Sequence, residues 1–369
     1  MRRQRRQPRQ NPYRAYRGKS RWGRILSWTA GALAVLLLLL AAGAWAMFRQ
    51  EWAIAGTIRR LDAPRPVYFM EIEGDYHFDA FLQQGGASSD QEVSAFLTEK
   101  ISKGFYTAST TLSGTGCSVL SAQSEDGSLL WGRNFDWTGS VPIILRHVPE
   151  DGYASLSTCD FQNITGSADV LPEGVVNRML AIAALYVPMD GVNEAGLCVA
   201  DLEVNEGGMP DPDTEKPDLT VTTAIRLLLN RAATVEEALA LLEQYDIHPS
   251  GGISHHLAIS DAGGASVAVE FTADGFTAVP TQAATNFNLA KGDTSAGGES
   301  ARTRYETLLA RLARGVISPE QVRDALSAAA QPDGAWTTQW SLVYDHAAGT
   351  ASWYFGGDFD ARYDFQIVQ

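Results

Sequence analysis

The longest apolar run of the chain lies near its N-terminus and predicts a membrane anchor. Residues 25–48 contain no charged side chain, and segment 1–24 carries ten Lys and Arg residues and no acid. At about 1.5 Å of rise per residue, such a helix crosses a bilayer core of roughly 30 Å. The positive-inside rule places the basic tail in the cytoplasm and the rest of the chain outside, as a single-pass cell-membrane protein. A cleaved signal peptide is the alternative, because Ala44-Trp45-Ala46 has the small-x-small form of a cleavage site.

Beyond residue 116, short apolar runs occur in pairs that are separated by turn residues, which is the pattern of β-hairpins. The first pair, Cys117–Ala122 and Leu129–Trp131, is joined through Asp126-Gly127, the strongest short-range hairpin signal. Further strands are expected at 143–147, 257–260, 266–271, 341–344 and 352–355, and helices at 221–232, 234–245, 302–314 and from 318 onward. Hairpins and helices in separate groups predict an α+β fold of stacked antiparallel sheets covered by helices.

Segment 49–116 has a different pattern from the rest. Ser89-x-x-Glu92 is a capping box, and the helix that it opens carries an apolar face of Val93, Phe96, Leu97 and Ile101. The Ser-, Thr- and Gly-rich stretch 107–116 then leads to Cys117, and a stretch of this composition is an accessible place for a chain to be cut. We therefore expect 49–116 to be a pro-segment and 117–369 to be the functional domain.

Charge and cysteine content limit the partners. The chain has 29 Lys and Arg and 43 Asp and Glu; without segment 1–24 it keeps 19 basic residues and a net charge of −24. Such an acidic domain argues against nucleic acid as a partner. Three cysteines, an odd number in an oxidising compartment, leave at least one free unless it pairs between chains. Cys198 lies in an apolar run and is expected to be a buried hydrophobe, the state of Cys159 is open, and no CxxC or His/Cys cluster suggests a metal.

The first predicted hairpin brings a thiol beside a cation and a carboxylate. Its second strand leads into Gly132-Arg133-Asn134-Phe135-Asp136-Trp137. Because the end of the second strand lies beside the start of the first, Arg133 and Asp136 are delivered next to Cys117. This environment makes a cysteine reactive. The ordinary alternative is a buried cysteine beside a hairpin salt bridge.

These residues resemble the choloylglycine hydrolase superfamily of N-terminal-nucleophile amidases, over roughly residues 70–369. Cysteine followed by the frame Gly-Arg-Asn-x-Asp-aromatic matches at Cys117, Arg133 and Asp136. Three further motifs of the family are present, namely Asn193-Glu194-Ala195-Gly196-Leu197, Thr285-Asn286 and Ser300 with Arg304-Tyr305. We expect Asn193 to shape a turn rather than to contact substrate.

Two departures from the bile-salt hydrolases indicate the acid ceramidase-like branch, which includes N-acylethanolamine acid amidase. Where bile-salt hydrolases have a functional Asn, this chain has Glu203, as the ceramidase-like branch does. Bile-salt hydrolases also begin essentially at the cysteine, whereas here Gly74-Asp75-Tyr76-His77 and the residues after it resemble a ceramidase-like pro-segment.

The resemblance implies a four-layer αββα N-terminal-nucleophile hydrolase fold and hydrolysis of linear amide C–N bonds in N-acyl amides, lipid amides among them. Cleavage between Gly116 and Cys117 would free an α-amine, whose ordinary pKa of about 7.7 to 8.0 lets it accept the thiol proton at neutral pH. The sulfur would then attack the amide carbonyl, and water would resolve the thioester. This chemistry needs no metal or organic cofactor.

The resemblance also implies roles for the remaining site residues. Asn286 would donate to the developing oxyanion. Arg133 and Asp136 would orient and tune the nucleophile and the amine, and Glu203 and Arg304 would complete the polar wall. Two alternatives stay open: an acyltransferase of the same fold, in which an amine replaces water at the thioester, and a catalytically inactive membrane-anchored binding ectodomain.

Overall fold

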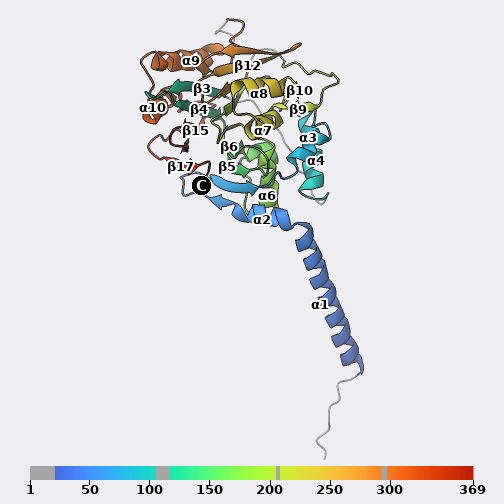
Figure 1. Cartoon of the computed structure of the whole chain (residues 1–369). Helices are drawn as coiled ribbons and strands as arrows, with labels where there is room; N and C mark the ends of the chain where they lie inside the picture. The colour runs from blue at the N-terminus through green and yellow to red at the C-terminus, as the bar shows by residue number, and fades with distance from the viewer. Residues whose placement is uncertain (1–20, 105–115, 205–207, 293–296, 369) are drawn as a thin grey trace, which may run out of the picture. The chain divides into compact units, whose positions relative to one another are not determined.

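The computed structural model describes residues 21–104, 116–204, 208–292 and 297–368 (Figure 1). The chain divides into two compact units, Met1–Trp52 and Ala53–Gln369. Most of the described part of the first unit is helix α1 (Arg21–Met47), which buries none of its residues. This one helix among the described residues is long and apolar enough to cross a membrane, a test that a signal sequence also passes. Residues 1–20 of the predicted basic tail lie outside the described residues.

Two large sheets form the centre of the second unit. Within the described residues, a nine-stranded sheet runs in the order β1 (Arg59–Arg60), β2 (Tyr68–Glu73), β5 (Pro142–Val148), β6 (Ser155–Asp160), β7 (Asp190–Asn193), β8 (Cys198–Glu203), β11 (His255–Ser260), β12 (Ser266–Thr272) and β13 (Gly275–Pro280). A six-stranded sheet, counted over the same residues, runs in the order β14 (Ala283–Ala284), β3 (Gly116–Gln123), β4 (Leu129–Trp137), β15 (Thr337–Asp345), β16 (Thr350–Phe355) and β17 (Tyr363–Gln366). Strands β9 (Asp218–Thr220) and β10 (Asp246–His248) form a small parallel pair.

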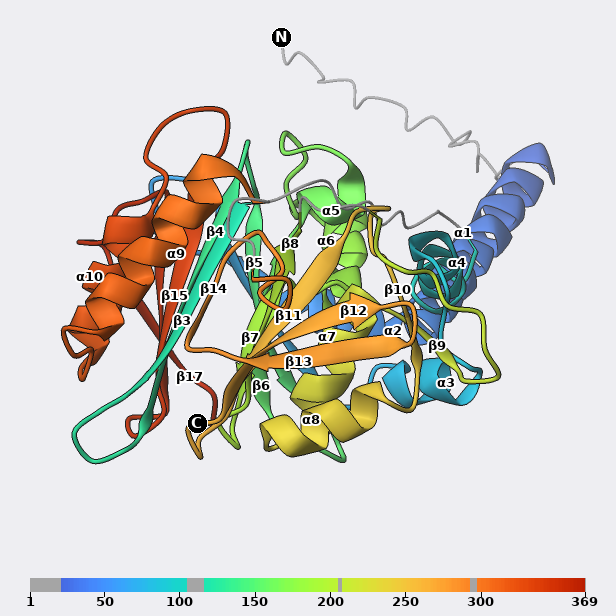
Figure 2. The ribbon, with the colours of Figure 1, turned by 90° about the horizontal axis from the view of Figure 1, so that it is seen from above.

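Helices cover the outer faces of both sheets, and Figure 2 shows them on opposite sides of the two-sheet stack. Helices α9 (Gly298–Leu312) and α10 (Pro319–Ala329) lie on the six-stranded sheet, while α7 (Val221–Arg231) and α8 (Val235–Leu242) lie on the nine-stranded one. The shorter helices are α2 (Arg49–Thr57), α3 (Phe78–Gln83), α4 (Asp90–Lys100), α5 (Gln162–Thr165), α6 (Gly174–Leu180) and the 3₁₀ helix η1 (Ala181–Leu185). The side chains of Thr234 and Ser318 cap the N-termini of α8 and α10.

The hydrophobic core follows these layers. One cluster of buried residues lies between the nine-stranded sheet and its helices, a second lies between the two sheets, and a third lies under α9 and α10. The order helix, sheet, sheet, helix confirms the predicted αββα fold. Cys117 belongs to the cluster between the sheets.

The predicted hairpin is confirmed in place and register. Strands β3 and β4 are antiparallel, with Gly116 opposite Asp136 and Cys117 opposite Phe135. Gly127 supplies the positive φ of 84° that the turn requires. Strand β4 extends beyond the predicted run to Trp137, because β15 pairs with it along its length.

Segment 49–116 contributes elements to the second unit. Strand β2 pairs in parallel with β5 inside the nine-stranded sheet. The apolar face predicted for the helix from Ser89 is buried in the cluster under that sheet. Position 116 is therefore no boundary between compact units. The prediction that the chain is processed there stays a prediction, and 107–115 lie outside the described residues.

Candidate active site

The second residue of β3, Cys117, is fully buried, and its side chain points into the layer between the two sheets. Arg133 Nη2 donates to Cys117 Sγ at 3.2 Å and to the Asp201 main-chain oxygen at 2.9 Å. Arg133 also forms an ion pair with Asp190, and both side chains are fully buried. Trp340 Nε1 donates to the same Asp190 carboxylate at 2.8 Å. The thiol thus faces a guanidinium that the surrounding protein holds in one position.

The alternation of strand side chains explains why Arg133 and Asp136 reach different sides of Cys117. Arg133 and Phe135 point from β4 toward the other sheet, where Phe135 stacks on Trp340 with ring centroids 3.8 Å apart. Asn134 and Asp136 point toward the helices, and Asn134 Nδ2 donates to the Leu326 oxygen of α10 at 2.9 Å.

Asp136 is buried beside the start of β3 and is held by two neutral donors. Thr338 Oγ1 donates to Asp136 Oδ1 at 2.7 Å, and Gln331 Nε2 donates to Oδ2, also at 2.7 Å. Arg304 Nη1 lies 3.6 Å from the same Oδ2. Burial raises the pKa of Asp136, and Arg304 with the two hydrogen bonds opposes the rise.

The remaining predicted residues hold the backbone of Cys117. Its amide nitrogen donates to Asn286 Oδ1 at 2.9 Å, and its carbonyl oxygen accepts from Arg304 Nη1. Arg304 Nη2 donates to Asn286 Oδ1 at 2.7 Å. Asn286 Nδ2 donates at 2.9 Å to the main-chain oxygen of Glu203, whose side chain is buried. All six predicted site residues therefore come together, although Glu203 is linked to Asn286 through its backbone.

In the uncut chain the thiol is protonated at neutral pH. Burial raises the pKa of Cys117 to about 11; Asp136 and Asp201 also raise it, while Arg133 lowers it. A nucleophilic Cys117 therefore needs a base that takes the proton as the sulfur reacts.

Several residues of this network were not predicted, because only the sheet order brings them to Cys117. Asp190 comes from β7, and Thr338 with Trp340 from β15, while Gln331 follows α10. The side chain of Asp201 also forms a hydrogen bond with His255, with 2.8 Å between His255 Nδ1 and Asp201 Oδ1. A weak signal was available for Asp190, which stands in the same strand as the motif residue Asn193.

The contacts also bear on the expectations for Asn193 and for the two other cysteines. Asn193 shapes a turn, since its Nδ2 donates to the Leu229 and Ala232 oxygens at 3.0 and 2.8 Å and its Oδ1 accepts from Leu197 N. Cys198 is buried in β8, and Cys159 is likewise buried and free of any disulfide. Within the described residues, no group of three or more His, Cys, Asp and Glu side chains could hold a metal ion.

A depression of about 330 Å³ lies at the start of β3, and three residues of this network line it. Its lining includes Gly116, Asn286, Arg304, Gln331 and Trp336.

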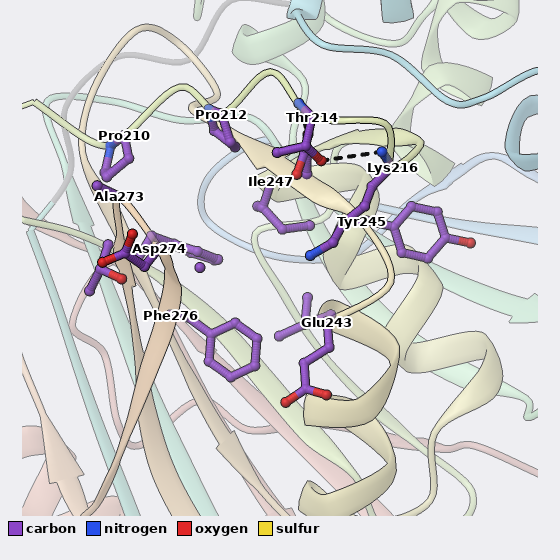
Figure 3. A pocket seen from close by; sticks show the side chains of 15 residues that line it. Pro210, Pro212, Thr214, Lys216, Glu243, Tyr245, Ile247, Ala273, Asp274 and Phe276 are labelled. Atoms are coloured by element: carbon purple, nitrogen blue, oxygen red, sulfur yellow. Dashed lines mark hydrogen bonds between the residues drawn. The ribbon is translucent and has the colours of Figure 1, made fainter.

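A second cavity, of about 450 Å³, contains none of the predicted site residues in its lining. Figure 3 shows Phe276, Tyr245 and Ile247 around it. Phe271 and Phe276 pack on the cluster under the helices, whereas Cys117 lies in the cluster between the sheets. The cavity therefore belongs to the other face of the nine-stranded sheet.

Comparisons with known proteins agree with this arrangement. A family model described as linear amide C–N hydrolases, choloylglycine hydrolase family, matches residues 117–286 and so begins at Cys117. No curated protein matches the chain. A structure of penicillin V acylase from Agrobacterium tumefaciens is similar at 21% identity and a TM-score of 0.48, covering 65% of this chain and 83% of its own.

Two variants of the conjugated bile acid hydrolase from Clostridium perfringens are similar as well. They share 16% and 17% identity with TM-scores of 0.49 and 0.51, and each alignment covers 68% of this chain and 92% of the other. The likeness with the TM-score of 0.51 supports the shared fold. Residues 117–286 thus match the choloylglycine hydrolase family of linear amide C–N hydrolases, and the match begins at the predicted nucleophile.

Proposed function

We propose that the protein hydrolyses N-acyl amides with Cys117 as an N-terminal nucleophile. One observation carries the proposal: the sulfur, the amide nitrogen and the carbonyl oxygen of Cys117 each contact a different predicted site residue. These are Arg133, Asn286 and Arg304, respectively. Any buried backbone N–H and C=O need partners, but a thiol that served only packing would not need a buried guanidinium beside its sulfur.

Cleavage of the Gly116–Cys117 bond would supply the missing base. The Cys117 nitrogen would become an α-amine with an ordinary pKa of about 7.7 to 8.0, so a fraction of it is unprotonated near neutral pH and can act as a base. Asn286 Oδ1, which accepts from this nitrogen at 2.9 Å, would keep it beside the sulfur. The amine would take the thiol proton, directly or through water, while the Arg133 guanidinium stabilises the developing thiolate.

The sulfur would then attack the carbonyl carbon of a linear amide. The substrate amine leaves with a proton, an acyl thioester remains on Cys117, and water hydrolyses it to a free acid. Asn286 and Arg304, which already surround the Cys117 backbone, would stabilise charge on the substrate oxygen. Asp136, opposite Gly116 in the ladder, would tune the charge of the new amine.

Within the family, the ceramidase-like branch is the better fit. Glu203 stands at the position that distinguishes that branch, and the segment before Cys117 supplies strand β2 and helices α3 and α4 to the fold. With α1 as an uncleaved anchor, the amidase would face outward at the cell membrane, a location suited to N-acyl lipid amides.

The test uses the full chain and a panel of N-acyl amides that differ in acyl chain and amine, with products identified by mass spectrometry. We expect free acid and amine from the wild type, none from Cys117→Ala, and activity in the control Cys198→Ala, which removes a buried thiol outside the network. Added primary amines would divert the acyl group if the enzyme is an acyltransferase. Equal hydrolysis by Cys117→Ala, or a cleaved and folded protein without activity on any member, would refute the proposal.

A further inference from the structure

Helix α6 exposes two adjacent apolar side chains on its first turn. Val175 and Val176 are 59% and 54% exposed, whereas Met179 of the same helix is buried. A single exposed valine needs no explanation, but a neighbouring pair on one short helix is a small apolar patch.

Two arginines flank these valines. Arg178 belongs to α6, and its Nη1 donates to the Ala55 oxygen at 3.3 Å. Arg60 Nη1 lies 3.8 Å from Oε1 of Glu173, the residue just before α6, and both side chains of this pair are about half exposed. We call Val175, Val176, Arg178 and Arg60 the α6 patch. It combines apolar and cationic groups on a domain that is otherwise strongly acidic.

The α6 patch contacts a residue that follows the predicted anchor closely in the sequence. Ala55, which Arg178 contacts, is separated from Met47 at the end of α1 by seven residues, most of them in helix α2. At about 1.5 Å of rise per helical residue, this connection covers on the order of 12 Å. Trp52, within it, is 40% exposed, and tryptophan is enriched where membranes meet water.

We propose that the α6 patch is a membrane-contact surface that rests on the phospholipid bilayer. Val175 and Val176 enter the interfacial layer, and the guanidinium groups of Arg60 and Arg178 bind lipid phosphates. The contact would give the Ala53–Gln369 unit a fixed face toward the bilayer. The proposal rests on α1 being a retained anchor, which belongs to the proposed function.

The experiment places a reporter on the patch. Val175→Cys in the full chain is labelled with an environment-sensitive fluorophore after reconstitution into nanodiscs of phosphatidylcholine and phosphatidylglycerol. The three native cysteines are buried, and wild-type protein gives the background labelling. Ile317→Cys is the matched control, because Ile317 is 42% exposed and belongs to the connection between α9 and α10. These two helices lie far from α6 in Figures 1 and 2.

We expect the emission of the label at position 175 to shift to shorter wavelength and to be quenched by spin-labelled lipid, with neither effect at position 317. Adding Arg60→Gln to the Val175→Cys chain should weaken the quenching. A nanodisc-bound chain whose label at 175 behaves like that at 317 overturns the proposal, and so does a chain that does not enter nanodiscs. Amide hydrolysis, measured on the same samples, tests the catalytic proposal separately, since the fluorescence readout does not depend on it.

Discussion

Arg133 and Asp136 stand three residues apart on strand β4 and yet lie near Cys117 on opposite faces of the sheet. Arg133 contacts the sulfur within the layer between the sheets, while Asp136 lies on the helix side, opposite Gly116. If the Gly116–Cys117 bond is cut as proposed, the pair would tune two different groups, the thiol and the new amine. A salt bridge between them, the ordinary alternative for such a hairpin, is not what the structure shows: Arg133 pairs with Asp190, and Asp136 lies near Arg304.

Replacing Arg133 should cost stability as well as activity. Arg133→Met leaves the buried Asp190 carboxylate without its cation, and breaking a buried ion pair in this way costs about 3–5 kcal/mol. Adding Asp190→Asn removes the unpaired charge and should restore much of the free energy of unfolding, measured by chemical denaturation. Activity should stay lost in the double variant, because the thiol still lacks its guanidinium. Recovery of activity together with stability would show that Arg133 is only structural.

Gln331 should position Asp136. Its Nε2 donates to Asp136 Oδ2 at 2.7 Å, and its Oε1 accepts from Ser300 Oγ at 3.0 Å. Gln331→Glu replaces that donor by a carboxylate next to the Asp136 carboxylate. Because the two negative charges repel each other, the pKa of one of the two carboxyl groups rises. Activity should fall at neutral pH and recover as the pH is lowered, because the protonated acid again donates to Asp136.

A pH–rate profile of Gln331→Glu beside wild type and Ser300→Ala checks this. Ser300→Ala removes the outer hydrogen bond without adding charge, so the shape of its profile should stay that of the wild type. An unchanged profile in Gln331→Glu would mean that Asp136 does not depend on this contact.

The thiol itself offers a third measurement at the residue scale. In the uncut chain, burial raises the pKa of the Cys117 thiol to about 11 from its ordinary value of 9.0. Because the neutral form of an acid is favoured by a raised pKa, thiolate appears only as the pH rises toward that value. Alkylation of uncut protein by iodoacetamide should therefore be slow at pH 7 and increase steeply above pH 9, and cleaved protein should react already near neutral pH. Fast labelling of the uncut chain at pH 7 would contradict this prediction.

At the scale of elements, the hairpin explains what the sequence could predict. A turn signal between two apolar runs fixes the register of β3 on β4, so Cys117, Arg133 and Asp136 could be placed from local pattern. Asn286, Arg304 and Glu203 came only from the family resemblance. Asp190 and Gln331 could not be found, because the strand order and the connection after α10 that bring them in depend on long-range packing.

Strand β2 belongs to the segment before Cys117, and its pairing in the sheet should keep the two fragments together after cleavage at Gly116. It lies between β1 and β5 in the nine-stranded sheet, and its residues Tyr68 to Met70 and Ile72 are buried. Purified protein should give two bands in a denaturing gel, the larger beginning with Cys117, yet migrate as one particle without denaturant. An active protein that stays a single uncut chain would disprove the processing.

The same strand makes the two fragments hard to separate. High salt screens exposed charge pairs and does not weaken apolar burial, so washed membranes should retain fragment 117–369. Urea should release it in the same step that unfolds it. Release by salt alone would show that β2 and the buried face of α4 do not hold the fragment.

At the scale of the whole molecule, a predicted anchor helix precedes an acidic domain whose surface includes the α6 patch. The net negative charge of the domain favours its solubility, and the α6 patch adds apolar and cationic side chains to its surface. If the helix were a cleaved signal sequence, the domain would be secreted. Alkaline carbonate extraction of membranes should leave the uncut chain and its N-terminal fragment in the pellet, and recovery in the supernatant would contradict the anchor.

The parallel pairing of β2 with β5 also bears on how the protein folds during synthesis. The ribosome synthesises β2 well before β5, so β2 is available for pairing when β5 emerges. A gene fragment that began at Cys117 would instead expose the apolar edge of β5 to other nascent chains, and such edges template aggregation. Segment 49–116 would thus work as a built-in chaperone, and producing the catalytic domain recombinantly would require both halves in the same cell.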